Sequence, residues 1–368
     1  MSTKKDKFSL KDKFYMRLAL NLAKARRGLT GNNPSVGCVI VKNDKLISVG
    51  QTGFNGRPHA EVNAINNSFQ SLSGSKIYVT LEPCNHYGVT PPCTKSIIKS
   101  GINKVYYSIN DIDNKVKGKS YKILTKKKIE VKKGLLKKEV LDHYESYIIN
   151  RKKKLPYITG KIAVSKNELI YSQGTKRITD EVSDKLSHYL RLKNDAILIS
   201  GKTLNIDNPK LNCRLRGYEN HSPIRVILDK NLEIKSNSKI FRSSKKKNTI
   251  IFHHSFDKFK IKILENKGIN LIRSKLNNQN HFDLITILKK LYKLDIRNLL
   301  VEGGDKLTKN FIKNKLINRF YLFKSPKILK KNQNYQNFTS LNILNKLYSS
   351  KSKSSYKLAK DHITIYKR

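Results

Sequence analysis

One histidine and two cysteines constrain this chain more than any other feature of its 368 residues. His59 is followed along the chain by Cys84 and Cys93. One imidazole and two thiolates can hold a zinc ion and leave its fourth coordination position open, whereas a structural zinc site closes that position with a fourth protein ligand. No fourth ligand is evident in the sequence. The three residues therefore predict a catalytic zinc site, and a non-catalytic zinc-binding protein is the least favoured alternative.

Glu61 stands two residues after His59, where a carboxylate can move protons without binding the metal. Zinc lowers the pKa of bound water toward neutrality, and a nearby glutamate can take that proton and deliver it to a departing amine. The order His-x-Glu, Pro-Cys, Cys is the signature of the zinc deaminases. It predicts Glu61 as the catalytic residue and His59, Cys84 and Cys93 as the zinc ligands.

The local sequence supports this geometry. Apolar residues follow His59 at helical spacing, residues 76–81 indicate a buried strand that leads to Cys84, and two prolines favour a helix start at Cys93. A thiol at a helix N-terminus is favoured as the thiolate that binds metal. The alternatives, inert buried residues or a Cys84–Cys93 disulfide, are disfavoured because nothing indicates an oxidising compartment.

The chain length predicts two domains. Residues 150–156 form a basic run that ends in proline and suits a linker, so we expect domains at residues 1–150 and 151–368. Beyond the linker, strands alternate with helical stretches, which predicts α/β layers around a mainly parallel sheet. The expected strands are 157–164, 196–200, 224–229, 249–253, 270–272, 298–301 and 363–366, and the expected helices are 180–193, 282–292 and 305–313.

A strand that runs into two glycines is the strongest candidate site of the second domain. Residues 299–301 are apolar, Glu302 follows them, and Gly303 and Gly304 precede a helical pattern. Glycines let a backbone approach a ligand closely, and amides at a helix N-terminus attract phosphate. The GxGxxG motif is absent, so a standard Rossmann domain is not expected. A turn without a ligand is the alternative.

The chain is strongly basic, with 76 lysines and arginines against 27 acidic residues and a net charge of +49. Such a charge ordinarily suggests a nucleic-acid partner. The lysines are spread along the whole chain instead of clustering, so we interpret them as solvated surface charge and expect no specific nucleic acid. No apolar run is long enough to span a membrane and no secretory signal is visible, so we expect a cytoplasmic protein without membrane contact.

Three segments resemble the bifunctional riboflavin-biosynthesis deaminase/reductase family: residues 30–41, 58–62 and 80–94. The loop between the two cysteines, residues 85–92, is the most specific of these, because cytidine deaminases, tRNA adenosine deaminases and polynucleotide cytosine deaminases lack it. The resemblance covers nearly the whole chain. It implies an α/β protein with two αβα-sandwich domains, the first like cytidine deaminase and the second like dihydrofolate reductase.

The second domain is similar to the family's reductase at residues 191–203 and 207–211 and at Arg214. The resemblance implies NADPH contacts at Ala163, Arg177, Thr203, Asp207, Gly304, Asp305, Lys306, Leu307, Thr308, Lys309 and Asn310. It implies substrate contacts at Thr175, Arg191, Leu211, Arg214 and Glu302. The two substrate arginines suit a phosphate because a guanidinium group binds it bidentately.

The chain departs from the family pattern at several positions. Arg177 replaces a common Trp, and residues 165–168 are Ser-Lys-Asn-Glu where Ser-Leu-Asp-Gly is usual. In the first domain Asn85 and Val89 replace the usual Ser and Arg of the cysteine loop, and Thr52 replaces a common His. The zinc pattern is intact, so the departures affect the expected reductase more than the deaminase.

The resemblance implies a homo-oligomeric enzyme that uses zinc and NADPH. Its substrate would be a phosphoribosyl pyrimidine, 2,5-diamino-6-(5-phosphoribosylamino)pyrimidin-4(3H)-one, which is deaminated before its ribosyl group is reduced to ribityl. Two alternatives stay open. One is a deaminase whose second domain has lost activity, and the other is a tRNA or polynucleotide deaminase with a basic extension.

Overall fold

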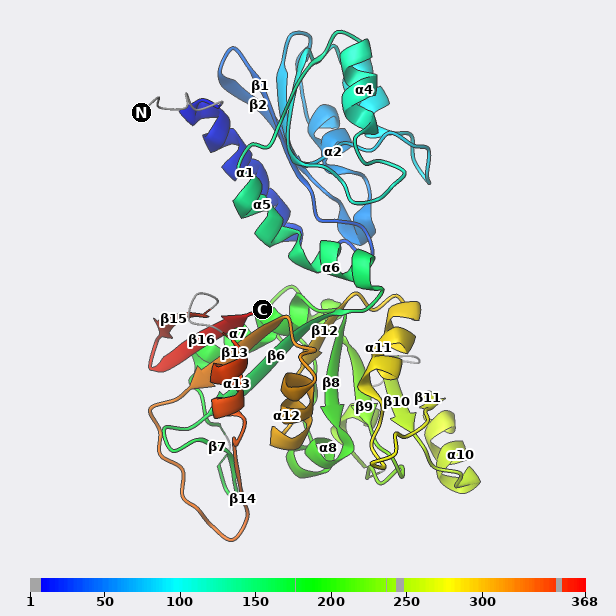
Figure 1. Ribbon diagram of the computed structural model, residues 1–368, viewed down its shortest axis with the longest axis vertical. Coiled ribbons are helices and arrows are strands. Elements are labelled where there is room, and N and C mark those ends of the chain that lie inside the picture. The colour runs from blue at the N-terminus through cyan, green and yellow to red at the C-terminus, as the bar shows by residue number, and fades with distance from the viewer. Residues whose placement is uncertain (1–7, 176, 236, 243–247, 349–352) are drawn as a thin grey trace. The chain divides into compact units, whose positions relative to one another are not determined.

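The computed structural model describes residues 8–175, 177–235, 237–242, 248–348 and 353–368. The chain divides into two compact units, Met1–Lys152 and Lys153–Arg368. Each unit has its own sheet and its own hydrophobic cores (Figure 1). Among the described residues, no helix has both the length and the apolar character needed to cross a bilayer.

A five-stranded sheet with the order β2-β1-β3-β4-β5 forms the centre of the first unit. β1 pairs antiparallel with β2 and β3, whereas β3, β4 and β5 run parallel. The strands are β1 (Gly37–Lys42), β2 (Lys45–Gln51), β3 (Lys76–Leu81), β4 (Lys104–Ile109) and β5 (Glu130–Lys133). The helices are α1 (Leu10–Arg26), η1 (Phe54–Gly56), α2 (Ala60–Asn66), α3 (Cys93–Lys99), α4 (Lys119–Lys126), α5 (Lys137–His143) and α6 (Glu145–Lys153).

Helices cover both faces of this sheet, so the first unit is an αβα sandwich (Figure 1). Successive residues of a strand point to opposite faces. Cys38 and Ile40 accordingly join one core with residues of α2 and α3, whereas Val39 and Val41 join the other core with residues of α1. Burial on both faces explains why β1 is a continuous apolar run.

The second unit contains a nine-stranded sheet with the order β11-β10-β9-β8-β12-β6-β13-β16-β15. The strands from β11 to β13 in this order are parallel, and β16 and β15 add an antiparallel edge. The strands are β6 (Tyr157–Val164), β8 (Ala196–Ser200), β9 (Ile224–Leu228), β10 (Thr249–His253), β11 (Asn270–Arg273), β12 (Asn298–Val301), β13 (Arg319–Lys324), β15 (Lys353–Leu358) and β16 (Asp361–Lys367). A separate pair joins β7 (Leu169–Ser172) to β14 (Tyr335–Asn337).

Helices lie on both faces of the larger sheet as well. They are α7 (Glu181–Leu192), α8 (Gly201–Asp207), η2 (Glu219–His221), α9 (Lys239–Arg242), α10 (Lys258–Asn266), α11 (Leu284–Lys293), α12 (Asp305–Lys313) and α13 (Leu341–Leu347). Apolar residues of α11, α12 and α13 fill one core, whereas those of α7, α8 and α10 fill the other. The expected fold class, two αβα sandwiches, is therefore confirmed. The expected strands are present, and β7, β13, β14 and β15 were not predicted.

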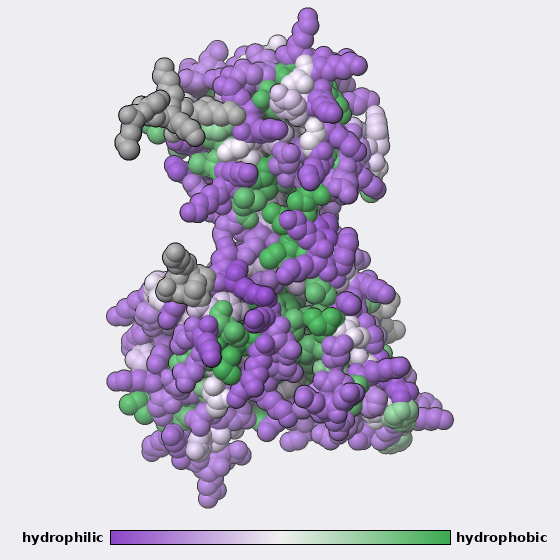
Figure 2. Space-filling view, viewed as in Figure 1, coloured by the Kyte–Doolittle hydropathy of each residue, from purple (hydrophilic) through white to green (hydrophobic). Residues whose placement is uncertain are grey.

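The order of strands in the second unit reverses at β12, which returns to lie between β6 and β8. Ligands of open parallel sheets bind at such a point, outside the carboxyl ends of the strands. The face of the molecule drawn in Figure 2 is mostly hydrophilic, as expected for lysines distributed over solvated surfaces.

Candidate active sites

The predicted zinc ligands converge in the first unit. His59 is the residue before α2, Cys93 is the first residue of α3, and Cys84 lies just beyond the end of β3. The His59 Nδ1 atom is 3.3 Å from Cys93 Sγ and 3.5 Å from Cys84 Sγ. The three ligand atoms lie within 4.8 Å of one another, and among the described residues no fourth His, Cys, Asp or Glu completes the cluster. One nitrogen and two sulfur donors fit a zinc site with an open position.

The groups of this cluster shift one another's pKa values in different directions. Hydrogen bonds from the Cys93 thiol and the His59 ring lower the pKa of Cys84 to about 4, which makes it a thiolate at neutral pH. The Cys93 thiol, by its hydrogen bond to Cys84 and its burial, has a raised pKa, so the thiolate expected at this helix start is not favoured there. Burial and the charge of Cys84 raise the pKa of Glu61 to about 7. A carboxyl group with a pKa near the working pH is suited to both accept and donate a proton.

The backbone of β2 positions the helix that carries Glu61. A Cβ atom on Gly50 would lie 2.1 Å from the carbonyl oxygen of Ala60 and 2.4 Å from the amide nitrogen of Ala64, so α2 packs directly on the strand. Nearby, the Ser48 hydroxyl donates a hydrogen bond to the Ala64 carbonyl at 2.7 Å. The first turn of α2 can therefore occupy its place only while position 50 lacks a side chain.

We expect Gly50→Ala to lower the free energy of unfolding of the first unit by about 1–3 kcal/mol, as overpacking does. The displaced helix should also weaken zinc binding. Thermal denaturation and the zinc content of the purified protein measure the two effects. Gly304→Ala is a suitable control, since its added Cβ meets no atom closer than 3.5 Å. Unchanged stability and zinc content in Gly50→Ala would contradict this account.

Glu82 fixes a loop that borders the zinc cluster. Its buried carboxylate accepts backbone N–H hydrogen bonds from Asp111 at 3.2 Å, Gly118 at 3.0 Å and Ser120 at 3.2 Å. The Asn85 side-chain amide donates to the Val116 carbonyl at 3.3 Å. These bonds satisfy the acceptors of a buried carboxylate and close residues 110–118 over the site.

The resulting pocket has a volume of about 150 Å³. Besides His59, Glu61 and Cys84 it is lined by Asn33, Pro34, Val36, Thr52, Arg57, Leu81, Glu82, His86, Asp111, Asp113, Val116, Tyr147 and Arg151. Within the described chain the Nδ1 atom of His86 is buried without a hydrogen-bond partner, which leaves it available to a ligand. Sequence reasoning did not assign Arg57, Tyr147 or Arg151 to this site, since no local pattern distinguishes them.

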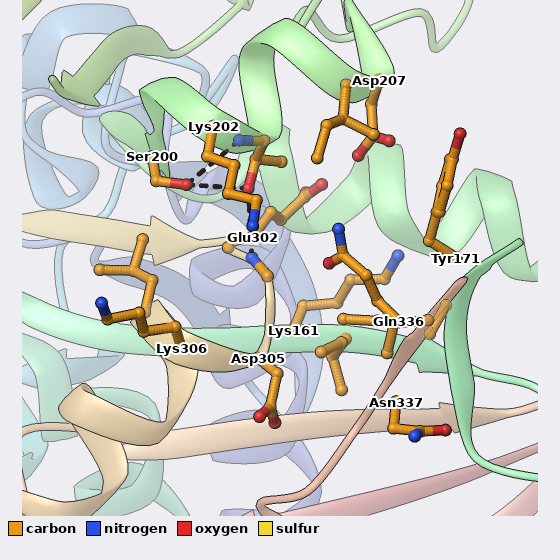
Figure 3. A pocket seen from close by; sticks show the side chains of 18 of the residues that line it. Lys161, Tyr171, Ser200, Lys202, Asp207, Glu302, Asp305, Lys306, Gln336 and Asn337 are labelled. Atoms are coloured by element: carbon orange, nitrogen blue, oxygen red, sulfur yellow. Dashed lines mark hydrogen bonds between the residues drawn. The ribbon is translucent and has the colours of Figure 1, made fainter. Parts of the chain in front are cut away.

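The second unit has a cavity of about 530 Å³ at the carboxyl ends of β6, β8 and β12. Figure 3 shows Lys161, Glu302, Asp207 and Tyr171 around it, from separate strands and helices. The Thr203 hydroxyl lies 3.0 Å from Ser200 Oγ and accepts the Gly304 N–H at 3.4 Å, which joins the start of α8 to the glycine turn. The cavity is of the size that takes small molecules and cofactors.

The glycine turn fits a dinucleotide. Gly304 precedes α12, and no side chain caps that helix. A ligand phosphate can therefore meet the first amides of α12 directly. An added Cβ on Gly303 would lie 2.6 Å from Leu307 Cδ2, so a larger residue there would require the Leu307 side chain to move.

Of the residues expected to bind the cofactor, those that line this cavity are Ala163, Thr203, Asp207, Gly304, Asp305, Lys306 and Leu307. Thr308, Lys309 and Asn310 follow in α12 but are not among its lining residues. Arg177 is not a lining residue, although Ile178 beside it is, and it forms an ion pair with Asp184 at 3.0 Å. The Trp position of the family is thus occupied here by a surface ion pair.

The residues expected to bind substrate divide between two places. Glu302 lines the large cavity, and Arg191, Leu211 and Arg214 line an adjoining groove with Lys210 and Lys239. Thr175 lines neither. Arg191 and Glu302 form a bidentate pair, with nitrogen–oxygen distances of 2.8 and 3.1 Å, and both side chains are largely buried. Arg191 also donates to the Asn212 carbonyl, so Arg214 is the freer of the two guanidinium groups for a phosphate.

Lys161 is a candidate functional residue that sequence reasoning missed. It interrupts the otherwise apolar strand β6 and lines the cavity beside Glu302. Burial lowers the pKa of its amine, and the charge of Glu302 opposes that shift. Burial raises the pKa of Glu302, whereas the charges of Arg191 and Lys161 lower it. The pKa of Glu302 is below its usual value as a result. The sequence did offer a sign of this functional residue, because a lysine is unusual inside a mostly apolar strand.

The His59, Cys84 and Cys93 cluster beside a buried glutamate defines the class of the first unit, a zinc deaminase, and the second unit has a cavity that fits a dinucleotide cofactor. The family model "Cytidine and deoxycytidylate deaminase zinc-binding region" matches residues 9–109, and the model "RibD C-terminal domain" matches residues 159–363. The chain belongs to the RibD family of riboflavin biosynthesis proteins. It is an enzyme with a zinc-dependent deaminase domain and an NADPH-dependent reductase domain.

Similar proteins span both domains. The riboflavin biosynthesis protein RibD of Aquifex aeolicus is 37% identical over 320 residues, which cover 86% of this chain and 88% of that protein. The RibD of Escherichia coli is 28% identical, over 87% and 89% of the two chains.

Solved structures agree. RibD of Acinetobacter baumannii superposes with a TM-score of 0.81 at 26% identity, covering 97% of this chain and 98% of the other. The deaminase/reductase of Thermotoga maritima gives 0.80 at 29% identity, with the same coverage.

Proposed function

We propose that the chain deaminates 2,5-diamino-6-(5-phosphoribosylamino)pyrimidin-4(3H)-one in the first unit and reduces the ribosyl group of the product in the second. The proposal rests chiefly on one observation, the convergence of His59, Cys84 and Cys93 beside the buried Glu61. Support for the substrate comes from the Thermotoga maritima relative, which is described as a diaminohydroxyphosphoribosylaminopyrimidine deaminase and 5-amino-6-(5-phosphoribosylamino)uracil reductase.

In the deamination, His59, Cys84 and Cys93 hold the zinc, which when bound supplies a Lewis acid that lowers the pKa of water. Glu61 accepts the proton from the attacking water and delivers it to the departing amine, so that ammonia leaves and a uracil remains. Its burial excludes bulk water from this transfer. The fixed loop 110–118, held by Glu82, closes the pocket around the pyrimidine.

In the reduction, the glycine turn and the start of α8 would hold NADPH, which would supply the hydride. The Lys161 ammonium donates a proton to the sugar oxygen that becomes a hydroxyl. The charge of Glu302 opposes the lowering of the Lys161 pKa by burial, and the ion pair with Arg191 holds Glu302 in place. Arg214 and Lys210 take the substrate phosphate in the adjoining groove.

The protein acts on a small molecule as a cytoplasmic homo-oligomer without a specific nucleic-acid partner. The distribution of lysines over the surface supports the last of these statements. Positive charge of this kind raises the rate at which anionic substrates and dinucleotides arrive.

One assay tests the proposed function. The zinc-loaded protein is given the diaminopyrimidine nucleotide with and without NADPH, and the products are identified by mass spectrometry. We expect the deaminated nucleotide without NADPH and its ribityl form with NADPH. Deamination alone in both samples would identify a chain whose second unit has lost activity. Ammonia release from tRNA, without turnover of the nucleotide, would identify a polynucleotide deaminase.

A further inference from the structure

Two arginines in the deaminase pocket have no role in the zinc chemistry. Arg57 lies between η1 and His59, and its Nη1 atom donates a hydrogen bond to Thr90 Oγ1 at 2.6 Å. Arg151 lies on α6, donates to the Asn32 carbonyl at 2.9 Å, and places its guanidinium 4.9 Å from the centre of the Tyr147 ring. Both line the pocket that contains Glu61.

The pocket also contains the carboxylates of Glu61, Glu82, Asp111 and Asp113, and in the described chain none of them is paired with these arginines. The carboxylates that share it have other partners: Glu82 accepts three backbone N–H groups, and Asp111 accepts the Tyr147 hydroxyl and the Asp113 N–H, each at 3.0 Å. Within the part of the chain that the structure describes, neither Arg57 nor Arg151 forms an ion pair with a carboxylate. A guanidinium group has five N–H donors, so each keeps donors for a ligand.

Arg57 also supplies a cation that the cysteine loop itself lacks. Residues 85–92 contain no lysine or arginine, and Val89 in this loop has 84% of its surface exposed. The Arg57 side chain reaches this loop from the preceding segment, since a Cβ added to Gly88 would lie 3.8 Å from Arg57 Nη2. A guanidinium group is thus held at the loop by a residue outside it.

We propose that Arg57 and Arg151 form an anion subsite of the deaminase pocket that binds the phosphate of the phosphoribosyl arm. The proposal rests on the proposed function, which gives the substrate that phosphate. Guanidinium groups match phosphate oxygens in bidentate geometry, and such charge-assisted bonds are stronger than neutral ones. The pyrimidine then lies at Glu61 while its ribose spans the pocket toward the arginines. Arg57 and Arg151 are substrate-binding residues and take no part in proton transfer.

The test compares deamination of the nucleotide with deamination of the same compound lacking its phosphate. We expect Arg57→Leu and Arg151→Leu each to raise KM for the nucleotide by about 10- to 100-fold, the effect of losing one charged hydrogen bond. Neither change should alter kcat, and neither should affect the dephosphorylated substrate. Arg57→Lys should recover part of the loss because it keeps the charge.

Thr90→Val is the matched control, because it removes the same hydrogen bond from Arg57 but keeps the guanidinium. It should bind the nucleotide as the parent does, with unchanged zinc content. If Thr90→Val reproduces Arg57→Leu, or if Arg57→Leu impairs both substrates equally, Arg57 only braces the loop and the proposal is wrong.

Calorimetric titration with D-ribose 5-phosphate separates this subsite from the proposed function. We expect Arg57→Leu to lose a binding event that Arg214→Leu, altered in the second unit, retains. If the parent does not deaminate the nucleotide but this loss is seen, the proposed function fails and the anion subsite stands. If Arg57→Leu binds ribose 5-phosphate as the parent does, the subsite is absent.

Discussion

Glu61→Gln is expected to reduce deamination by about 100- to 10,000-fold, the range over which a positioned acid–base group acts. Glutamine has the same shape as glutamate but can neither accept the proton of water nor return it to ammonia. His59, Cys84 and Cys93 remain in place, so the zinc content should be unchanged. Rates of ammonia release and metal analysis of the same preparation measure the two quantities.

The second activity of the chain provides the control for this variant. When Glu61→Gln is given the deaminated nucleotide and NADPH, it should reduce that compound at the parent rate. A variant that loses both activities would have a general folding defect. A variant that keeps zinc and deaminates normally would show that Glu61 is not the proton carrier.

The zinc site was predictable because its ligands lie on short segments with strong local signals. His59 and Cys93 stand at helix starts, and Cys84 follows an apolar strand. The helix and strand preferences of the neighbouring residues predict the position of such ligands without knowledge of tertiary contacts. The pocket around them was less predictable, since Arg57 and Arg151 come from segments about ninety residues apart and follow no periodic pattern.

In the second unit the sequence predicted the central strands because a parallel sheet buried on both faces requires continuous apolar runs. Strands β7 and β14 were not found because they have only four and three residues and, in the described chain, pair only with each other. They nevertheless bring Tyr171 and Gln336 to the cavity. Contacts between residues so far apart in the chain depend on tertiary structure and leave no local pattern.

Lys161→Met is expected to reduce the reductase step by about 100- to 10,000-fold and to leave deamination unchanged. Methionine fills a similar volume but cannot donate a proton to the sugar oxygen. Product formation from the deaminated nucleotide and NADPH measures the loss. Binding of NADPH, followed by its fluorescence, should persist, which separates a failure of proton transfer from a failure of cofactor binding.

The pH dependence gives this role a signature that a structural lysine would not produce. Burial lowers the pKa of the Lys161 amine, and the group donates a proton only while it is protonated. The parent rate of reduction should therefore fall as pH rises through that lowered pKa, and the residual rate of Lys161→Met should show no such fall. An identical fall in both proteins would assign the titration to another group.

Because Arg191 and Glu302 form a buried ion pair, substitution of Lys161 tests the proton donor better than substitution of either member of that pair. In Lys161→Met the Glu302 carboxylate keeps both hydrogen bonds from Arg191, so its buried charge stays paired and the unit should fold. Arg191→Met would instead leave Glu302 without its main partner, which costs about 3–5 kcal/mol for a buried pair. Loss of reduction in that variant would reflect unfolding as readily as chemistry. Only a variant that keeps this pair intact tests the proton donor itself.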